Sequence, residues 1–228
     1  MTELRVFPIE GVPEVTAGDD LGLLLVDAVG SPGFADNDVV VVTQKVVSKA
    51  EGRLVPAGDR ESALESESVR VLRRRGNMTI SETRHGFVCA NAGIDASNID
   101  GDNIALLPID PDASARRIRS RVGHLTGIDV AVVISDTFGR AWRIGQTDVA
   151  IGVAGFDPFT DHRGSTDTQG RELSATRIAI ADELAGAAEI VMGKSERICA
   201  AIVRGAPIKR DRGAATEIVR PASEDLFR

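Results

Sequence analysis

Two continuous runs of apolar and mostly β-branched residues restrict most strongly what this chain can fold into. They are DVVVVT at Asp38–Thr43 and DVAVVIS at Asp129–Ser135. Branching at Cβ suits a pleated strand better than a helix, and a short apolar run without polar interruption is typical of a buried strand. We therefore expect both segments to be buried strands.

Weaker patterns predict the remaining elements. Further strands are expected at Thr79–Ser81, Gly86–Asn91, Ile104–Leu107 and Ala200–Val203, the first two as a possible hairpin. Helical patterns cover Arg60–Arg75, Ala113–Leu125 and Glu172–Ala188. Asp112 is the expected N-cap of the second helix, and Gly127 its end. This mixture predicts an α+β fold with mixed or antiparallel sheets and few helices, in one domain over residues 1–228.

Composition excludes several classes of function. A formal net charge of −7 argues against general binding to nucleic acid, which needs a basic surface. No apolar run approaches the roughly 18 residues of a membrane span, and the N-terminus lacks a signal-peptide core, so we expect a cytoplasmic protein that does not bind membranes. Cys89 and Cys199 stand in apolar runs, so we expect both to be buried. A zinc site is not expected, because it would need more clustered Cys and His than this chain has.

A loose phosphate-loop pattern occurs at Ala188–Ser195, AEIVMGKS. A true phosphate loop follows a strand, and its glycines let backbone N–H groups surround the phosphates. Here the pattern follows a helical segment, and its interior, Glu189–Met192, is bulky and mainly apolar. A phosphate-loop NTPase is therefore only a weak alternative, and we expect the segment to serve another purpose.

Two carboxylates, Asp95 and Asp136, are the strongest candidates for chemistry. Each directly follows an apolar strand pattern, within VCANAGIDASN at Val88–Asn98 and VVISDTFGRAWRIG at residues 132–145. A strand end can hold polar groups rigidly in a cleft. Mg²⁺ and Mn²⁺ prefer such oxygen ligands, and the hydroxyl of Thr137 adds another beside Asp136.

Two arginines, Arg140 and Arg143, follow in the same segment. Their planar guanidinium groups suit binding of phosphate or carboxylate, so we expect them to hold an anionic substrate at the catalytic site. The alternative for Asp95 and Asp136 is a turn, because aspartate commonly caps strand ends through local hydrogen bonds. These residues alone do not name a reaction.

Longer motifs lie along nearly the whole chain in a fixed order. They are VPEV at Val12–Val15, VVSKAEGR at Val46–Arg53, NAGIDASN at Asn91–Asn98, SDTFGRAWRIGQTD at Ser135–Asp148, GREL at Gly170–Leu173, ADE at Ala181–Glu183 and VRG at Val203–Gly205. In these motifs the chain resembles the coenzyme F420-0:L-glutamate ligase family, which builds the γ-glutamyl tail of a deazaflavin cofactor. Arg220–Phe227 resembles the point where actinobacterial members continue into a flavin-binding domain, which we expect this chain to lack.

The resemblance implies a GTP-dependent ligase that joins L-glutamate to F420-0 through an acyl phosphate. It also implies two divalent cations, Mg²⁺ or Mn²⁺, with K⁺ as a further candidate, and an intertwined homodimer with the active site near the subunit interface. Carried over residue by residue, the metal ligands are Asp95, Asp136 and, for the second cation, Thr137. The nucleotide contacts are Val12, Pro13, Glu14, Val15, Gln44, Lys45, Lys49 and Asn98.

One position departs from the family pattern. Archaeal members place a metal-binding glutamate after a Met-Gly pair, whereas Met192-Gly193 is followed here by Lys194, with Glu196 two residues further on. The second cation site therefore lacks an expected ligand. A ligase-derived module that binds a nucleotide or deazaflavin without turnover is the alternative function.

Overall fold

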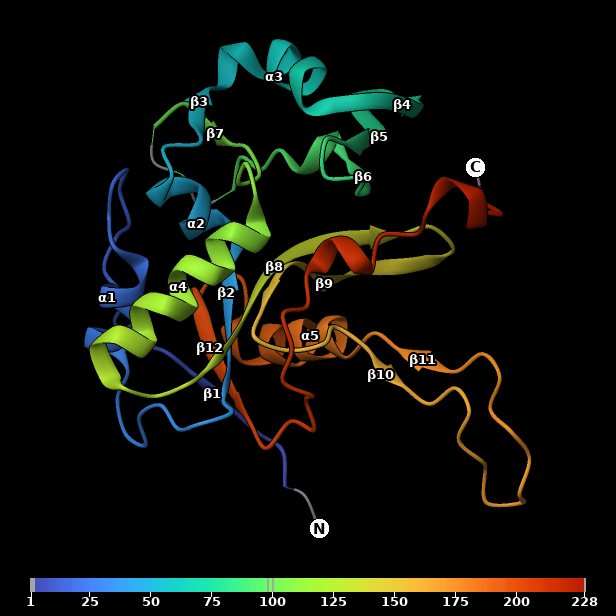
Figure 1. Ribbon diagram of the computed structural model, residues 1–228. Coiled ribbons are helices and arrows are strands. Elements are labelled where there is room, and N and C mark those ends of the chain that lie inside the picture. Colours follow the sequence, from blue (N-terminus) through green and yellow to red (C-terminus); the bar gives the residue numbers. More distant parts are fainter. Residues whose placement is uncertain (1–2, 98, 100, 228) are drawn as a thin grey trace.

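A five-stranded mixed sheet forms the centre of the computed structural model, which describes residues 3–97, 99 and 101–227 (Figure 1). In order across the sheet, its strands are β1 (Arg5–Pro8), β12 (Ala200–Arg204), β2 (Val39–Thr43), β8 (Ala131–Arg140) and β9 (Arg143–Ala154). Strands β2 and β8 run parallel, and the other neighbours run antiparallel. The predicted α+β class is confirmed, and the two β-branched runs are adjacent strands inside the sheet.

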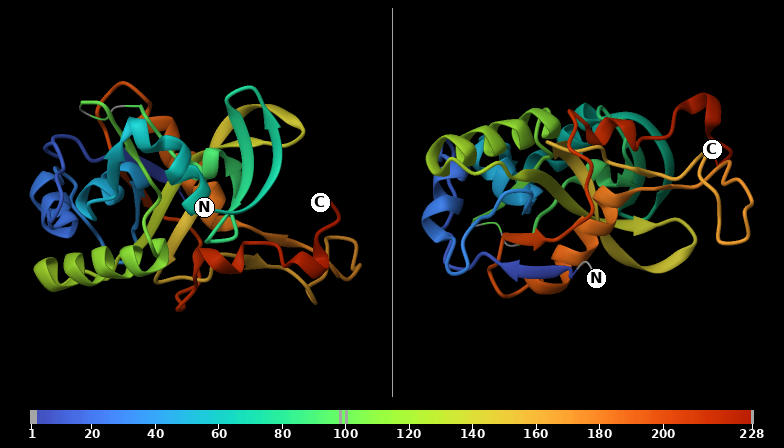
Figure 2. Two further views of the ribbon diagram at one scale, coloured as in Figure 1. Left: turned by 90° about the horizontal axis from the view of Figure 1, so that it is seen from above. Right: turned by 60° about the horizontal axis from the view of Figure 1, so that its bottom comes forward.

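Both faces of this sheet are covered, which explains why the strand sequences are continuously apolar. In Val39–Val42 the even-numbered side chains pack with α1 (Leu21–Ala28) and α4 (Pro111–Thr126), and the odd-numbered ones pack with α5 (Ile180–Met192). Successive side chains of a strand point to opposite faces, so a strand between two helical layers needs an apolar residue at every position. The two layers lie on opposite sides of the sheet in Figures 1 and 2.

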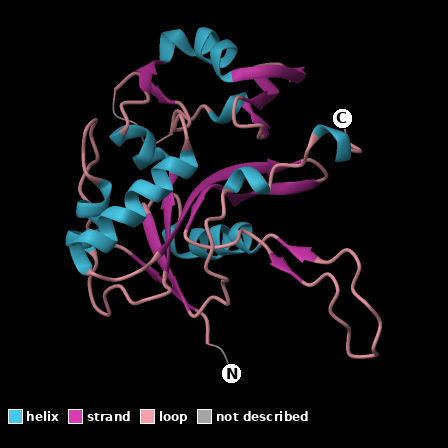
Figure 3. Ribbon diagram, in the orientation of Figure 1, coloured by secondary structure: helices cyan, strands magenta, loops and turns pink. Residues whose placement is uncertain are grey.

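Smaller elements surround this core. They are α2 (Gln44–Ala50), α3 (Arg60–Glu67), the pair β3 (Leu54–Pro56) and β7 (Asn103–Ala105), the sheet β4 (Ser68–Arg75), β5 (Met78–Thr83) and β6 (Val88–Ala90), and the pair β10 (Thr160–Asp161) and β11 (Arg177–Ile178). The predicted hairpin is confirmed as the antiparallel pair β5–β6. Strands β10 and β11 lead into a long arm that projects from the core (Figure 3).

Helix α4 starts two residues earlier than the sequence predicts. Its N-cap is Asp110, whose carboxylate accepts a hydrogen bond from the backbone N–H of Ala113 at 2.8 Å, so the prediction of Asp112 is wrong. Asp112 is instead buried and accepts a hydrogen bond from the N–H of Val153 in β9 at 2.7 Å. The predicted end is confirmed, since Gly127 has a φ of 74° and caps the helix in the left-handed conformation that glycine favours.

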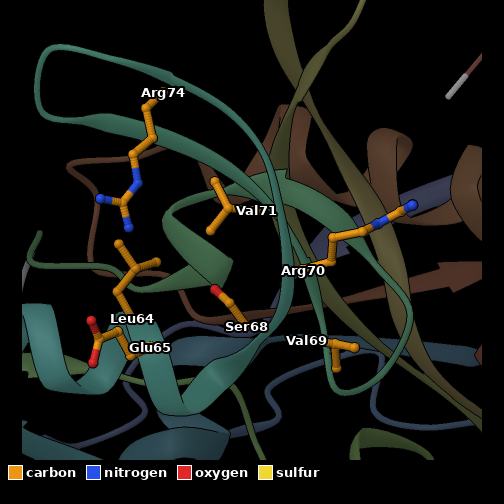
Figure 4. Close-up of a pocket in the computed structure, with 7 residues that line it drawn as sticks. All are labelled: Leu64, Glu65, Ser68, Val69, Arg70, Val71 and Arg74. Carbon is orange, nitrogen blue, oxygen red and sulfur yellow. The ribbon is translucent and has the colours of Figure 1, made fainter.

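The segment Arg60–Arg75 is only half helical, contrary to prediction. Helix α3 ends at Glu67, and the remainder forms β4, which pairs with β5. SVRVLRRR contains two β-branched valines, which favour a strand, and pairing with the antiparallel partner β5 outweighs a weak local preference for helix. Figure 4 shows this junction, with Leu64 on the helix and Arg74 on the strand.

The predicted helix at Glu172–Ala188 begins later, at Ile180. The residues before it include β11, which pairs with β10 in the projecting arm, so long-range pairing again overrides local helix preference. None of the helices that the structure describes combines the length and apolar character needed to cross a bilayer.

A close approach of α4 to β9 depends on glycine. A Cβ atom placed on Gly152 would lie 2.4 Å from the carbonyl oxygen of Pro111, which is backbone and cannot move aside easily. We predict that Gly152→Ala lowers the free energy of unfolding by about 1–3 kcal/mol, as overpacking does in well-packed cores. Urea denaturation measures the change.

The matched control is Gly58→Ala, because a Cβ at Gly58 meets no atom within 4 Å. It should change stability by no more than about 0.5 kcal/mol. Equal losses in the two variants would contradict the close contact between α4 and β9.

Candidate active site

A cleft of about 1240 Å³ lies over one end of the large sheet. Single small-molecule sites typically occupy about 300–1,000 Å³, so the cleft has room for more than one ligand. The predicted site residues that line it are Val12, Pro13, Glu14, Val15, Gln44, Lys45, Lys49, Asp95, Asp136 and Thr137. Segments far apart in the sequence therefore meet here as predicted. Asn98 lies outside the described residues.

The hairpin of β8 and β9 forms the floor of the cleft. Strand β8 continues past the sheet to Arg140, so Asp136 lies inside a strand and the prediction that it follows a strand end is wrong. The strand continues because β9 pairs with it along this extension, after a register shift between Ile134 and Ser135. This pairing places Thr137 directly opposite Asp148.

Asp148 is a functional candidate that the sequence analysis missed. It is only 3% exposed. Its Oδ2 accepts a hydrogen bond from Ser135 Oγ at 2.9 Å, and its Oδ1 accepts one from Thr137 Oγ1 at 2.5 Å. The sequence alone did not give this pairing, because Arg140 pairs with Arg143 next to the turn, and only a register shift between Gly139 and Arg140 brings Asp148 opposite Thr137.

Lys194 approaches the same group from the end of α5. Its Nζ lies 2.6 Å from Thr137 Oγ1, 3.3 Å from Asp148 Oδ1 and 3.3 Å from Glu189 Oε1. Burial on its own would lower the pKa of Lys194, but the two carboxylates of Asp148 and Glu189 raise it above its ordinary value. The side chain is therefore a stable ammonium group in contact with the cleft floor.

Asp136 is the least compensated charge in the cleft. Burial raises the pKa of its carboxyl group to about 8, and the nearby charges of Asp95 and Asp148 add to the effect. Its Oδ1 accepts a hydrogen bond from the N–H of Thr137 at 2.8 Å. Within the described residues it forms no ion pair with a lysine or arginine. An added cation would remove this electrostatic penalty.

Asp95 has a cationic partner. Lys45 Nζ lies 2.8 Å from Asp95 Oδ2 and donates a hydrogen bond to Ser97 Oγ at 2.8 Å. Burial opposes ionisation, but Lys45 and the N–H of Ser97 together lower the pKa of Asp95. The turn that we considered as the alternative role of Asp95 is present, because its Oδ1 accepts a hydrogen bond from the N–H of Ser97 at 2.7 Å. Its Oδ2 faces Lys45.

These carboxylates fit part of a divalent cation site. In the described part of the chain, no three His, Cys, Asp or Glu side chains converge into a complete metal cluster. Mg²⁺ is commonly held by one or two carboxylates together with substrate phosphates and water. Asp95 and Asp136 line the same cleft, and the charge of Asp95 helps to raise the pKa of Asp136, so the pair suits that incomplete arrangement.

A second basic group borders the cleft. The Lys49 ammonium is almost fully buried and forms a short ion pair with Glu14, which joins α2 to the loop after β1. Gln44, buried at the start of α2, accepts a hydrogen bond from Ser48 Oγ at 2.9 Å. These groups are positioned to contact a ligand next to the acidic floor.

The two thiols that border the cleft are unsuited to nucleophilic chemistry. Both cysteines are free, and Cys89 is buried as predicted, while Cys199 is half-buried. Burial, reinforced by the charge of Asp136, raises the pKa of Cys89 to about 12, and burial raises that of Cys199 to about 11. A thiolate is the reactive form, so neither residue is a candidate nucleophile.

Arg140 and Arg143 do not lie in this cleft. Both are exposed at the tip of the β8–β9 hairpin, where Arg140 donates a hydrogen bond to the carbonyl of Ile144 at 2.9 Å. The extension of β8 carries them past the acidic residues. The structure therefore does not bring these two arginines together with the other predicted site residues.

The phosphate-loop interpretation of Ala188–Ser195 does not match the fold. Helix α5 continues to Met192, so the interior of the pattern is helical, and Gly193, with a φ of 61°, ends the helix. A phosphate loop instead joins a strand to a following helix. The segment supplies Lys194 to the cleft floor in place of a phosphate-binding loop.

The raised pKa of Asp136 leads to a stability prediction for the metal-free protein. The folded state keeps a proton that the unfolded state loses above pH of about 4, so this group lowers stability as the pH rises to about 8. Asp136→Asn removes the effect and should raise the free energy of unfolding by about 1–3 kcal/mol at pH 8, since a tenfold change in proton affinity is worth about 1.4 kcal/mol. The gain should shrink towards pH 4 in urea denaturation with chelator present.

The control for that comparison is Asp211→Asn at an exposed loop position. Its free energy of unfolding should not rise relative to wild type as the pH increases. A destabilised Asp136→Asn variant at pH 8 would show that this carboxylate is compensated in the native protein.

Comparison with known proteins agrees with the motifs. The family model described as F420-0:Gamma-glutamyl ligase matches residues 11–205. A protein of Methanothermobacter thermautotrophicus named coenzyme F420:L-glutamate ligase is 42% identical over 99% of both chains. Proteins of the same name from Methanocaldococcus jannaschii and Methanococcus maripaludis are 40% and 37% identical, over 85% and 99% of this chain and 85% and 98% of their own. The chain therefore belongs to the F420-0:γ-glutamyl ligase family.

Proposed function

We propose that this protein joins L-glutamate to the carboxylate of coenzyme F420-0, using GTP to activate that carboxylate. The cleft floor is the observation that carries the proposal: Asp95, Asp136 and Asp148 gather negative charge there, with lysines beside them. Such a floor suits a cation and nucleotide phosphates together. The names of the relatives supply the substrate class.

The chemistry requires activation, because a carboxylate does not react with an amine at neutral pH. In the proposed route a carboxylate oxygen of F420-0 attacks the γ-phosphorus of GTP, which forms an acyl phosphate and releases GDP. The α-amine of glutamate then attacks the acyl carbon, the amide bond forms, the nitrogen loses a proton and inorganic phosphate leaves. The reaction depends mainly on positioning and charge neutralisation.

Different residues of the cleft would bind the cation and the phosphate groups. Asp95 and Asp136 would hold a Mg²⁺ or Mn²⁺ ion, which neutralises charge on the phosphate oxygens when bound. Lys45 now pairs with Asp95 and would become available to phosphate once that carboxylate takes another partner. Lys49, paired with Glu14, lies on the neighbouring wall and is the second candidate to contact phosphate.

A homodimer belongs to the same proposal. The tip of the β8–β9 hairpin exposes Trp142 and Ile144, at 74% and 101%, and carries Arg140 and Arg143, which do not line the cleft of their own chain. Exposed apolar groups at the end of a projecting ribbon are typical of an interface. In such a dimer the two arginines would reach the anionic substrates of the partner.

The alternative is a module that binds nucleotide or deazaflavin without turnover. The two functions differ in product, since only the ligase consumes GTP as a glutamate is added. Family membership alone does not decide between them, because a fold can persist after its activity is lost.

We predict that purified protein with GTP, Mn²⁺, glutamate and F420-0 forms GDP and a product one glutamate heavier, detected by mass spectrometry. Asp95→Asn and Asp136→Asn should each lower the rate at least about 100-fold, a usual effect of removing one electrostatic contact to a reacting phosphate. Asp211→Asn serves as the matched control and should stay within about twofold, as surface changes usually do.

Binding of GTP without any ligation by the wild-type protein would favour the non-catalytic alternative. Full activity of Asp136→Asn at saturating Mn²⁺ would remove that residue from the site.

A further inference from the structure

A charged side chain of the protein contacts Thr137, the residue that the family resemblance assigns to a second cation. The ammonium nitrogen of Lys194 lies 2.6 Å from Thr137 Oγ1, the hydroxyl that the family resemblance assigns to a second metal. The same nitrogen lies 3.3 Å from the buried carboxylate of Asp148 and 3.3 Å from that of Glu189. Three oxygen groups thus surround one fixed positive charge.

The backbone directs Lys194 into this position. Gly193 caps α5 with a φ of 61°, a conformation that glycine adopts without strain, and turns the chain so that the next side chain returns over the last turn of the helix. Glu189, on that last turn, contacts Lys194. The ammonium position is therefore determined by the helix end and by the β8–β9 hairpin together.

We propose that the Lys194 ammonium replaces the second divalent cation, so that this protein binds one divalent ion per chain, at Asp95 and Asp136, and uses Lys194 as a permanent monovalent charge beside it. This rests on the proposed function for the first ion only. An ammonium group has donors and no lone pair, so it cannot itself bind a metal. A second ion on Thr137 and Asp148 would have to displace it, at oxygen distances of about 2.0–2.6 Å.

The nearby Glu196 does not restore the missing ligand. Its carboxylate is directed to its own neighbour, accepting hydrogen bonds from the backbone N–H of Ser195 at 2.9 Å and from Ser195 Oγ at 3.0 Å. The carboxylate oxygens of Asp148 instead accept hydrogen bonds from Ser135, Thr137 and Lys194. The local network is complete without a metal ion.

The test counts Mn²⁺ ions bound per chain by electron paramagnetic resonance and calorimetry, with Mn²⁺ alone and with Mn²⁺ and GDP. Wild type should bind one ion in both conditions. Lys194→Glu supplies a carboxylate next to Asp148 and should bind two. Lys194→Gln, whose amide can still hydrogen bond to Thr137, should bind the second ion more weakly than Lys194→Glu. Lys209→Glu makes the same charge change outside the cleft and should bind one.

The outcomes separate this proposal from the proposed function. Two ions in wild type, or only one in both Lys194 variants with native circular dichroism, would overturn the role of Lys194. No ion in wild type but one in Lys194→Glu would support that role and count against the first metal site. No ion in any variant would reject both.

Discussion

The antiparallel pairing of β8 with β9 beyond the edge of the sheet determines where the acidic groups of the cleft lie. Because the two strands stay paired past the sheet, Thr137 and Asp148 face each other, and Asp136 is held beside them on rigid backbone. A loop at this point would let the carboxylates move apart to relieve their repulsion. The ribbon prevents that, and the charge remains concentrated in the cleft.

The concentration of charge lowers the stability of the empty protein. Asp136 bears most of the penalty, as its raised pKa indicates, while Asp95 is compensated by Lys45 and Asp148 by Lys194. This unequal compensation assigns separate tasks to the carboxylates. In the proposed function, Asp136 would bind the cation, Asp95 would exchange Lys45 for a ligand, and Asp148 is already paired with Lys194.

How much was predictable from the sequence depends on whether a feature is local. The buried strands β2 and β8 were predictable, because a strand covered on both faces must be apolar at every position. The division of Arg60–Arg75 into a helix and a strand was not predictable, because the strand forms by pairing with β5, which comes later in the chain. The predicted metal and nucleotide residues that the structure describes meet in one cleft, as the motifs indicated.

Three features of the site needed the structure. Asp148 stands at the end of a sequence motif, and only the register of the β8–β9 hairpin brings it opposite Thr137 in the cleft. Arg140 and Arg143 seemed close to Asp136 in sequence, but an extended strand carries neighbours away by about 3.3 Å per residue. Lys194 could be noticed as a departure from the family pattern, but its contacts with Thr137 and Asp148 come from the packing of α5 against β9.

In the proposed reaction, the charged cleft activates a carboxylate by phosphoryl transfer. Its most direct test uses F420-0 labelled with ¹⁸O in the reacting carboxylate, GTP and glutamate, with the released phosphate analysed by mass spectrometry. An acyl phosphate passes the attacking carboxylate oxygen to phosphorus, so we predict that each phosphate released during ligation carries one ¹⁸O atom. Unlabelled phosphate from a reaction that still forms the glutamylated product would contradict it.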